Sequence, residues 1–188
     1  ALRLIAAANA IEDPEAAFAA LAAPIGADIP VCLGAGGRRA AFMTGIGEHV
    51  WRPSDRDLLP ETGLPAVLVN PRVAVATGTV FKALGAAPLR AASTSSAIPP
   101  APFADTSQLL AYLESRPNDL EAPARRLVPV IGEVLEVLRM LPGARVARMS
   151  GSGATCFALF DDEAHAARGA ASLAAHQPEW WVVATSLR

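Results

Sequence analysis

The fold of this 188-residue chain is decided by residues 144–160, which read ARVARMSGSGATCFALF. Two apolar segments, residues 144–149 and 154–160, flank a run of four small residues at 150–153. Short apolar runs rich in Val, Phe and Thr are typical of strands, and a Gly/Ser cluster between them is typical of a tight turn. The stretch therefore predicts a β-hairpin.

The residues after the hairpin extend this prediction into a fold class. Asp161 is expected to cap a helix that runs to about residue 175, and residues 180–185 predict a last strand. A hairpin followed by a helix and a strand is typical of an α+β sandwich, in which helices cover one face of an antiparallel sheet.

Upstream of the hairpin, residues 64–69 (LPAVLV) predict a buried strand, and Thr77 is expected to cap a short helix. Further helices are predicted at about 106–115 and 120–140, the second kinked by Pro129. One apolar stripe is expected along that second helix, made of Leu127, Val130, Ile131, Val134, Leu135 and Leu138.

The first third of the chain predicts a separate domain. Helices are expected at its start and at about 14–22, followed by strands at 31–33 and 39–44. A segment rich in Pro, Asp and Arg at about 52–63 is the expected boundary, which divides the chain into domains 1–63 and 64–188. Residues 86–105 are small and Pro-rich, and we expect them to form a mobile loop that closes over a neighbouring cleft.

Composition excludes several classes of function. The formal net charge is −2 with no basic run, so neither nucleic acid nor an anionic membrane is an expected partner. No apolar stretch reaches the roughly 18–20 residues of a membrane span, and a cytoplasmic protein is expected. The scattered histidines match no metal-binding spacing, and Cys32 and Cys156 are expected to be reduced, buried thiols. Lys82 is the only lysine.

The turn of the hairpin is the first candidate site. Small residues and glycines allow successive backbone N–H groups to point at one anion, such as a phosphate. The alternative is a hairpin turn that needs glycine only for its backbone angles. The candidate residues are Ser150, Gly151, Ser152, Gly153 and Ala154.

Three further residues are candidates, each with a structural alternative. Asp28 lies on a turn before an apolar segment, where a carboxylate serves either as a general base or as a turn cap. Thr77 and Phe81 are four residues apart and share one face of a helix. They are either a cap and a core aromatic, or a polar contact and a ring that stacks on a base.

Five motifs occur in one order: GADIPVCL, GIGE, VNPRVAVATGTVF, NDLE and ARMSGSGATCFALF. This series resembles the GHMP small-molecule kinase superfamily over nearly the whole chain. The resemblance implies the remainder of an N-terminal catalytic domain in residues 1–63, followed by a ferredoxin-like α/β sandwich in 64–188. It narrows to the members that transfer the γ-phosphate of ATP, with Mg²⁺, to the 2-hydroxyl of a cytidine-diphosphate-linked methylerythritol in non-mevalonate isoprenoid synthesis.

The same resemblance implies a role for each candidate. Asp28 matches the base that takes the proton of the acceptor hydroxyl, and residues 150–154 match the loop that approaches the transferring phosphate. Thr77 matches a residue that lines the path of the sugar and diphosphate, and Phe81 matches the aromatic that stacks on cytosine. ATP and the small cytidine diphosphate derivative are the implied partners, with no metal ligand assigned and a monomer or homodimer expected.

The chain departs from the superfamily pattern at its start. The glycine-rich loop that wraps the ATP phosphates, and a lysine near the catalytic aspartate, are expected upstream of residue 1. The interpretation is an enzyme fragment with negligible activity of its own. Two alternatives stay open: a GHMP kinase for homoserine, mevalonate or a sugar, and a non-catalytic binding protein that kept the fold.

Overall fold

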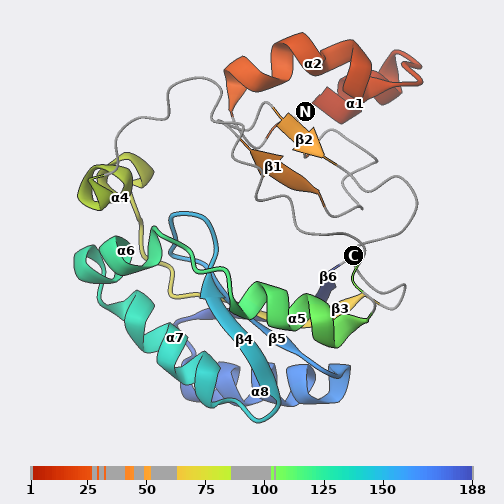
Figure 1. Cartoon of the computed structure of the whole chain (residues 1–188). Helices are drawn as coiled ribbons and strands as arrows, with labels where there is room; N and C mark the ends of the chain where they lie inside the picture. Colours follow the sequence, from red (N-terminus) through yellow and green to blue (C-terminus); the bar gives the residue numbers. More distant parts are fainter. Residues whose placement is uncertain are drawn as a thin grey trace. The chain divides into compact units, whose positions relative to one another are not determined.

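A computed structural model describes residues 2–26, 29, 32, 41–44, 49–51, 63–85, 103 and 105–187. The chain divides into two compact units (Figure 1). The N-terminal unit comprises residues 1–58, 88–103 and 188, and the sheet unit comprises residues 59–87 and 104–187. The assignment of residues 1–63 and 64–188 to two kinase domains stays a prediction.

The N-terminal unit begins with two helices, as expected. Helix α1 spans Leu2–Ala8 and α2 spans Pro14–Ile25. The Asp13 carboxylate accepts a hydrogen bond from the Ala16 N–H at 3.0 Å, which satisfies one of the free donors in the first turn of α2. Strands β1 (Phe42–Thr44) and β2 (His49–Trp51) then pair antiparallel.

One prediction for this unit is wrong and several lie outside the described residues. Cys32 has helical backbone and is exposed, which contradicts both the strand at 31–33 and the buried thiol. Asp28, the GIGE turn at 45–48 and most of the loops at 52–63 and 86–105 lie outside the part of the chain that the structure describes.

The sheet unit is built on four antiparallel strands in the order β4-β5-β3-β6. The hairpin strands β4 and β5 pair as predicted, with Met149 opposite Cys156. Chain order differs from sheet order because β3, which comes first, lies between β5 and β6. The bounds are Leu64–Asn70 for β3, Ala144–Met149 for β4, Cys156–Phe160 for β5 and Trp181–Leu187 for β6.

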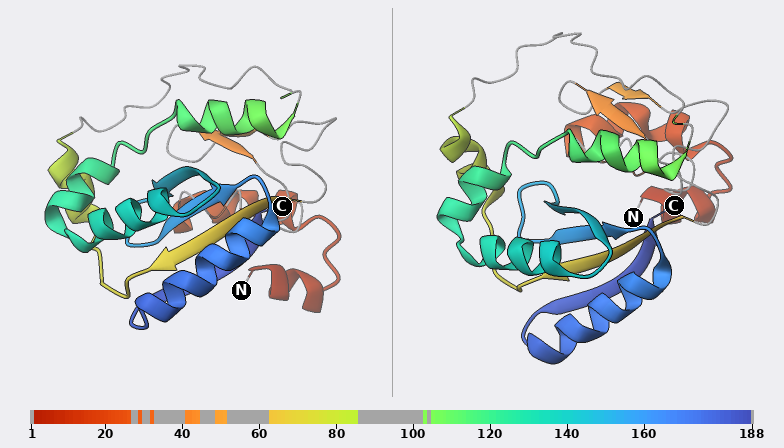
Figure 2. Two further views of the ribbon diagram at one scale, coloured as in Figure 1. Left: turned by 90° about the horizontal axis from the view of Figure 1, so that it is seen from below. Right: turned by 60° about the horizontal axis from the view of Figure 1, so that its bottom comes forward.

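Helices cover both faces of this sheet, not one. Helices α7 (Val130–Met140) and α8 (Glu163–His176) pack on one face, where Val67, Phe160 and Leu135 share a core. Helix α5 (Thr106–Glu114) contacts β4, and Figure 2 shows it on the side of the sheet opposite α8. The second face needs a cover because the strands carry apolar side chains there too, including Leu64, Ala66 and Leu159, which are all buried.

The predicted long helix at 120–140 is in fact two helices. Helix α6 spans Glu121–Leu127, and α7 starts after Pro129. Val128 has φ −137° and ψ 83°, because the proline ring disfavours helical backbone at the residue before it. The break changes the phase of the apolar stripe, so Leu127 is 44% exposed while the stripe residues of α7 are buried or half-buried.

Two predicted caps are shifted or replaced. Helix α8 is capped by Asp162, whose carboxylate accepts from the His165 N–H at 2.8 Å, while Asp161 pairs with Arg145. The two hydrogen bonds from His165, backbone N–H first, lower the pKa of Asp162. Helix α4 (Thr77–Leu84) has Ala76 at its N-cap position, so Thr77 is its first residue and makes no cap.

Within the described residues, no helix is long and apolar enough to cross a membrane.

Candidate functional site

The loop at residues 150–154 is a tight turn that closes the β4–β5 hairpin. The Ser150 N–H donates to the Thr155 carbonyl at 2.8 Å, and the Gly153 N–H donates to the Ser150 carbonyl at 3.0 Å. Gly153 has φ +89°, and a Cβ there would lie 2.9 Å from the Met149 sulfur and 3.1 Å from Ile131 Cδ1. Glycine is therefore required at this position both by its backbone angle and by space.

Part of this loop keeps hydrogen-bond donors available. Among the described residues, the backbone N–H groups of Gly151 and Ser152 donate to no acceptor of the protein. Gly151 is exposed, with φ +54°. Adjacent backbone N–H groups in such a turn are typical of an anion-binding concavity. The geometry therefore fits the phosphate interpretation of the loop.

Asn118 holds the loop from outside the hairpin. Its side-chain amide donates to the Met149 carbonyl at 2.9 Å and to the Gly151 carbonyl at 2.8 Å. Its carbonyl oxygen accepts from the Leu120 N–H at 3.0 Å, which orients the side chain. The sequence interpretation quoted this residue in the NDLE motif but assigned it no role, because its partners lie 31 and 33 residues away.

The first turn of α4 also reaches the loop. The Thr77 and Ser152 hydroxyl oxygens are 2.8 Å apart, and the Asn70 amide donates to the Thr155 hydroxyl at 2.9 Å. Two candidates that are 75 residues apart in the chain, Thr77 and Ser152, are thus brought into direct contact. The Thr77 hydroxyl is engaged with the loop and not with the backbone of its own helix.

Phe81 lies one turn after Thr77 on α4. Its side chain is 53% exposed, so the alternative of a core aromatic is wrong. Residues four apart share a helix face, which places this ring on the same side of α4 as the Thr77–Ser152 contact. An exposed ring one helical turn from a residue that contacts the glycine loop would suit a ligand with both a phosphate and a base.

Cys156 lies next to the site but is not a reactive group. Burial, and after it the negative charge of Glu121, raise the pKa of its thiol to about 12. A thiol with a pKa that high is not a nucleophile at neutral pH. Among the residues that the structure describes, no three His, Cys, Asp or Glu side chains gather where they could hold a metal ion.

Comparison with known proteins gives one consistent result. Residues 104–179 match the family described as GHMP kinases C terminal. The whole chain is 49% identical to 4-diphosphocytidyl-2-C-methyl-D-erythritol kinase of Rhodopseudomonas palustris strain BisB18 and 48% identical to the protein of that name in Methylobacterium radiotolerans. It spans 60% and 62% of these two relatives.

A solved structure supports the same relationship. The crystal structure of a 4-(cytidine 5′-diphospho)-2C-methyl-D-erythritol kinase is 32% identical and superposes with a TM-score of 0.62. The match covers 90% of this chain and 57% of that one. At this identity, the likeness extends to sequence as well as to fold.

Proposed function

We propose that the chain is part of an ATP-dependent small-molecule kinase, because residues 104–179 match the GHMP kinase C-terminal family and the whole chain is similar to proteins named 4-diphosphocytidyl-2-C-methyl-D-erythritol kinase. The proposed reaction moves the γ-phosphate of ATP to the 2-hydroxyl of 4-diphosphocytidyl-2-C-methyl-D-erythritol. The observation that carries this proposal is the contact between Thr77 and Ser152, which joins the substrate-side helix to the glycine loop. The relatives do not favour homoserine, mevalonate or a sugar as acceptor.

We assign each of these residues a role in the proposed reaction. The N–H groups of Gly151 and Ser152 hold phosphate oxygens, and Asn118 keeps the loop in shape. The exposed ring of Phe81 stacks on the cytosine, and Thr77 lines the path between the base and the loop. Asp28, which lies outside the described residues, takes the proton of the acceptor hydroxyl as its oxygen bonds to phosphorus and ADP leaves.

The cofactors and location follow from the same proposal. ATP is the phosphoryl donor, and we assign its phosphates to the loop. The Mg²⁺ that accompanies ATP is held largely by substrate phosphates and water, and we assign it no residue of this chain. We place the protein in the cytoplasm, where ATP is available, as a monomer or homodimer.

The experiment uses a polypeptide of the relatives' full length. In the Rhodopseudomonas palustris BisB18 protein, the matching segment is replaced by this 188-residue sequence. ATP-dependent phosphorylation of 4-diphosphocytidyl-2-C-methyl-D-erythritol is then measured for this chimera and for its variants. We expect turnover in the chimera, and loss of kcat in Asp28→Asn because the base is removed.

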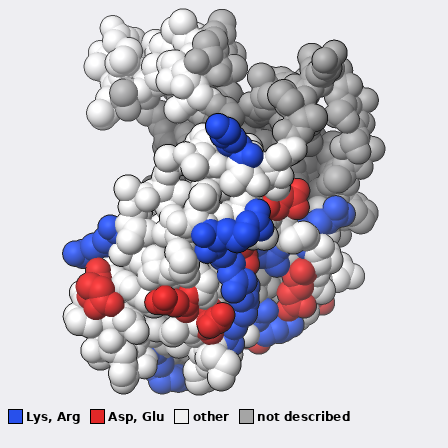
Figure 3. All heavy atoms as spheres, turned by 90° about the vertical axis from the view of Figure 1, so that its left-hand side faces the viewer, with Lys and Arg blue, Asp and Glu red and all other residues white. Residues whose placement is uncertain are grey.

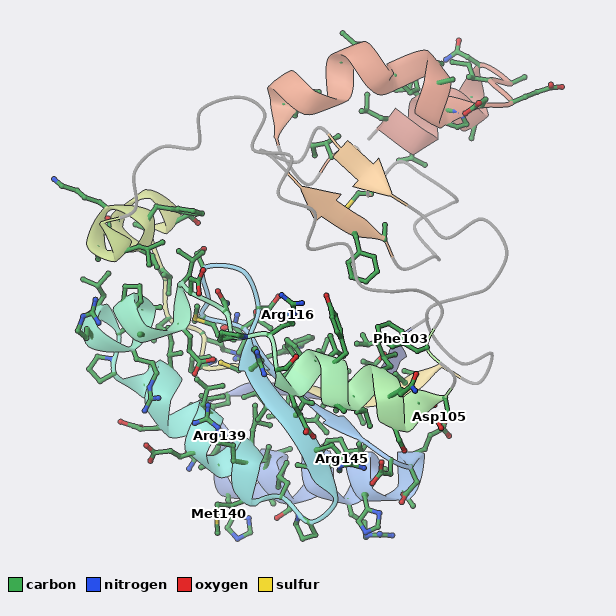
Figure 4. All side chains as sticks on the ribbon, in the orientation of Figure 1. Phe103, Asp105, Arg116, Arg139, Met140 and Arg145 are labelled. Carbon is green, nitrogen blue, oxygen red and sulfur yellow. The ribbon has the colours of Figure 1, made fainter. Side chains whose placement is uncertain are left out.

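Phe81→Ala tests the acceptor site. Stacking of a base on an aromatic ring contributes about 1–3 kcal/mol, so the KM for the cytidine substrate is expected to rise by about 5- to 150-fold. The matched control is Met140→Ala, an exposed apolar side chain at the end of α7, away from α4 (Figure 4). An unchanged KM in Phe81→Ala, or turnover of homoserine in place of the cytidine substrate, would show that the proposed substrate is wrong.

A further inference from the structure

The sheet unit has a concave surface to which the proposed reaction assigns no ligand. This cleft has a volume of about 540 Å³ and lies against the edge strand β4. Its walls come from the end of α5, from α6 and α7, from β4 itself, and from the connection between α5 and α6, where Asn118 also lines it. We call it the arginine cleft after four of its residues: Arg125, Arg139, Arg145 and Arg148.

The charge of the arginine cleft is opposite in sign to that of the chain. Four guanidinium groups line it against two carboxylates, those of Glu114 and Glu121, while the whole chain has a formal net charge of −2. Figure 3 faces the side on which α6 and α7 lie in Figure 1 and shows a band of Lys and Arg side chains there. A concentration of positive charge on an acidic protein needs a cause beyond solubility.

Each guanidinium group is anchored at one end and has donors left over. Arg139 lies 3.2 Å from the Glu121 carboxylate, and Arg145 lies 2.8 Å from Asp161 and 4.0 Å from Glu114 (Figure 4). Arg125 is 3.6 Å from Glu136. A guanidinium carries five N–H donors, so one such contact leaves most of them available.

Arg148 has no carboxylate partner among the residues that the structure describes. Its guanidinium instead donates to the backbone carbonyl of Arg116. That contact fixes the side chain without neutralising its charge. The side chains of Arg125, Arg139 and Arg145 are between 37% and 44% exposed, so their ion pairs are weak and rearrange readily when a stronger anion arrives.

We propose that the arginine cleft is a binding site for a compact polyanion with two linked phosphate groups. Planar guanidinium forks match the oxygens of a phosphate in pairs, which a lysine ammonium does not. The volume lies within the range of small-molecule sites. An extended nucleic acid is a poorer match, because the arginines converge on one cleft and do not follow a track along the surface.

The experiment titrates inorganic pyrophosphate into the 188-residue chain at low ionic strength, followed by calorimetry and by the Nε–H signals of arginine in NMR. We expect saturable binding that weakens as NaCl is added, because the contacts are electrostatic. The double variant Arg139→Gln/Arg145→Gln is expected to lose affinity by about tenfold or more, since hydrogen bonds to charged groups are the stronger class. Thermal unfolding of each variant shows that it is folded.

Two variants locate the binding. Arg168→Gln removes an exposed arginine from α8, outside the cleft, and is expected to bind like the wild type. Arg139→Lys/Arg145→Lys keeps the charge but not the fork, and an intermediate affinity is expected.

The proposal is overturned by any of three results. The first is that pyrophosphate fails to bind at millimolar concentration. The second is that the double variant Arg139→Gln/Arg145→Gln binds as tightly as the wild type. The third is that Arg168→Gln weakens binding by the same factor as that double variant. Each of them identifies the cleft as a solvated network of ion pairs. None of them bears on kinase turnover by the full-length chimera, so the two proposals stand or fall separately.

Discussion

Asn118→Ala is the substitution that best tests how the glycine loop is held. It removes the three side-chain hydrogen bonds of Asn118, which have lengths of 2.8, 2.9 and 3.0 Å. A typical hydrogen bond contributes a net 0.5–1.5 kcal/mol to stability, and the exposed Gly151 carbonyl regains water in the variant, so we expect a loss of about 2–3 kcal/mol. The loss falls mainly on the folded state, because two of these three bonds join segments that are 31 and 33 residues apart in the chain.

The assay is urea unfolding of the 188-residue chain followed by tryptophan fluorescence and far-UV circular dichroism. The matched control is Asp119→Ala, an exposed neighbour whose side chain makes no hydrogen bond within the described part of the chain, and it is expected to stay within about 0.5 kcal/mol of the wild type. A loss below about 0.5 kcal/mol in Asn118→Ala would refute the reasoning. In that case the hairpin alone, without Asn118, would be enough to hold the loop.

Two more outcomes follow from the packing around the loop. Gly153→Ala is expected to destabilise the chain by about 1–3 kcal/mol in the same urea assay, because the new methyl group meets Met149 and Ile131 and the backbone has a positive φ. The control is Gly78→Ala in α4, where a methyl group meets open space. This variant is expected to be neutral or to stabilise the chain by up to about 1 kcal/mol. At pH 8, iodoacetamide is expected to label Cys32, which is exposed, and to spare Cys156, whose buried thiol has a pKa of about 12. Mass spectrometry of native and urea-unfolded protein counts the labels. Modification of Cys156 in the native protein would contradict this prediction.

Local sequence signals predicted most of the sheet unit. The strands β3, β4, β5 and β6 and the helices α4, α5 and α8 all lie close to their expected positions, because side-chain periodicity and turn residues act over a few neighbours. Two details of the predicted helices were wrong, and each depends on a few neighbouring residues. Pro129 broke a helix that it was expected to kink, and Asp162 took the cap expected of Asp161, whose carboxylate pairs with Arg145.

The sequence by itself determined the α+β class, the hairpin with its glycine loop, and the kinase resemblance, since each depends on residues adjacent in the chain. Only the tertiary structure decided which side chains meet at that loop. The register of β3 against β5 places Asn70 beside Thr155, and α4, which follows β3, places Thr77 against Ser152. Such partners lie dozens of residues apart, and their contact depends on sheet order and strand register, which no local pattern encodes.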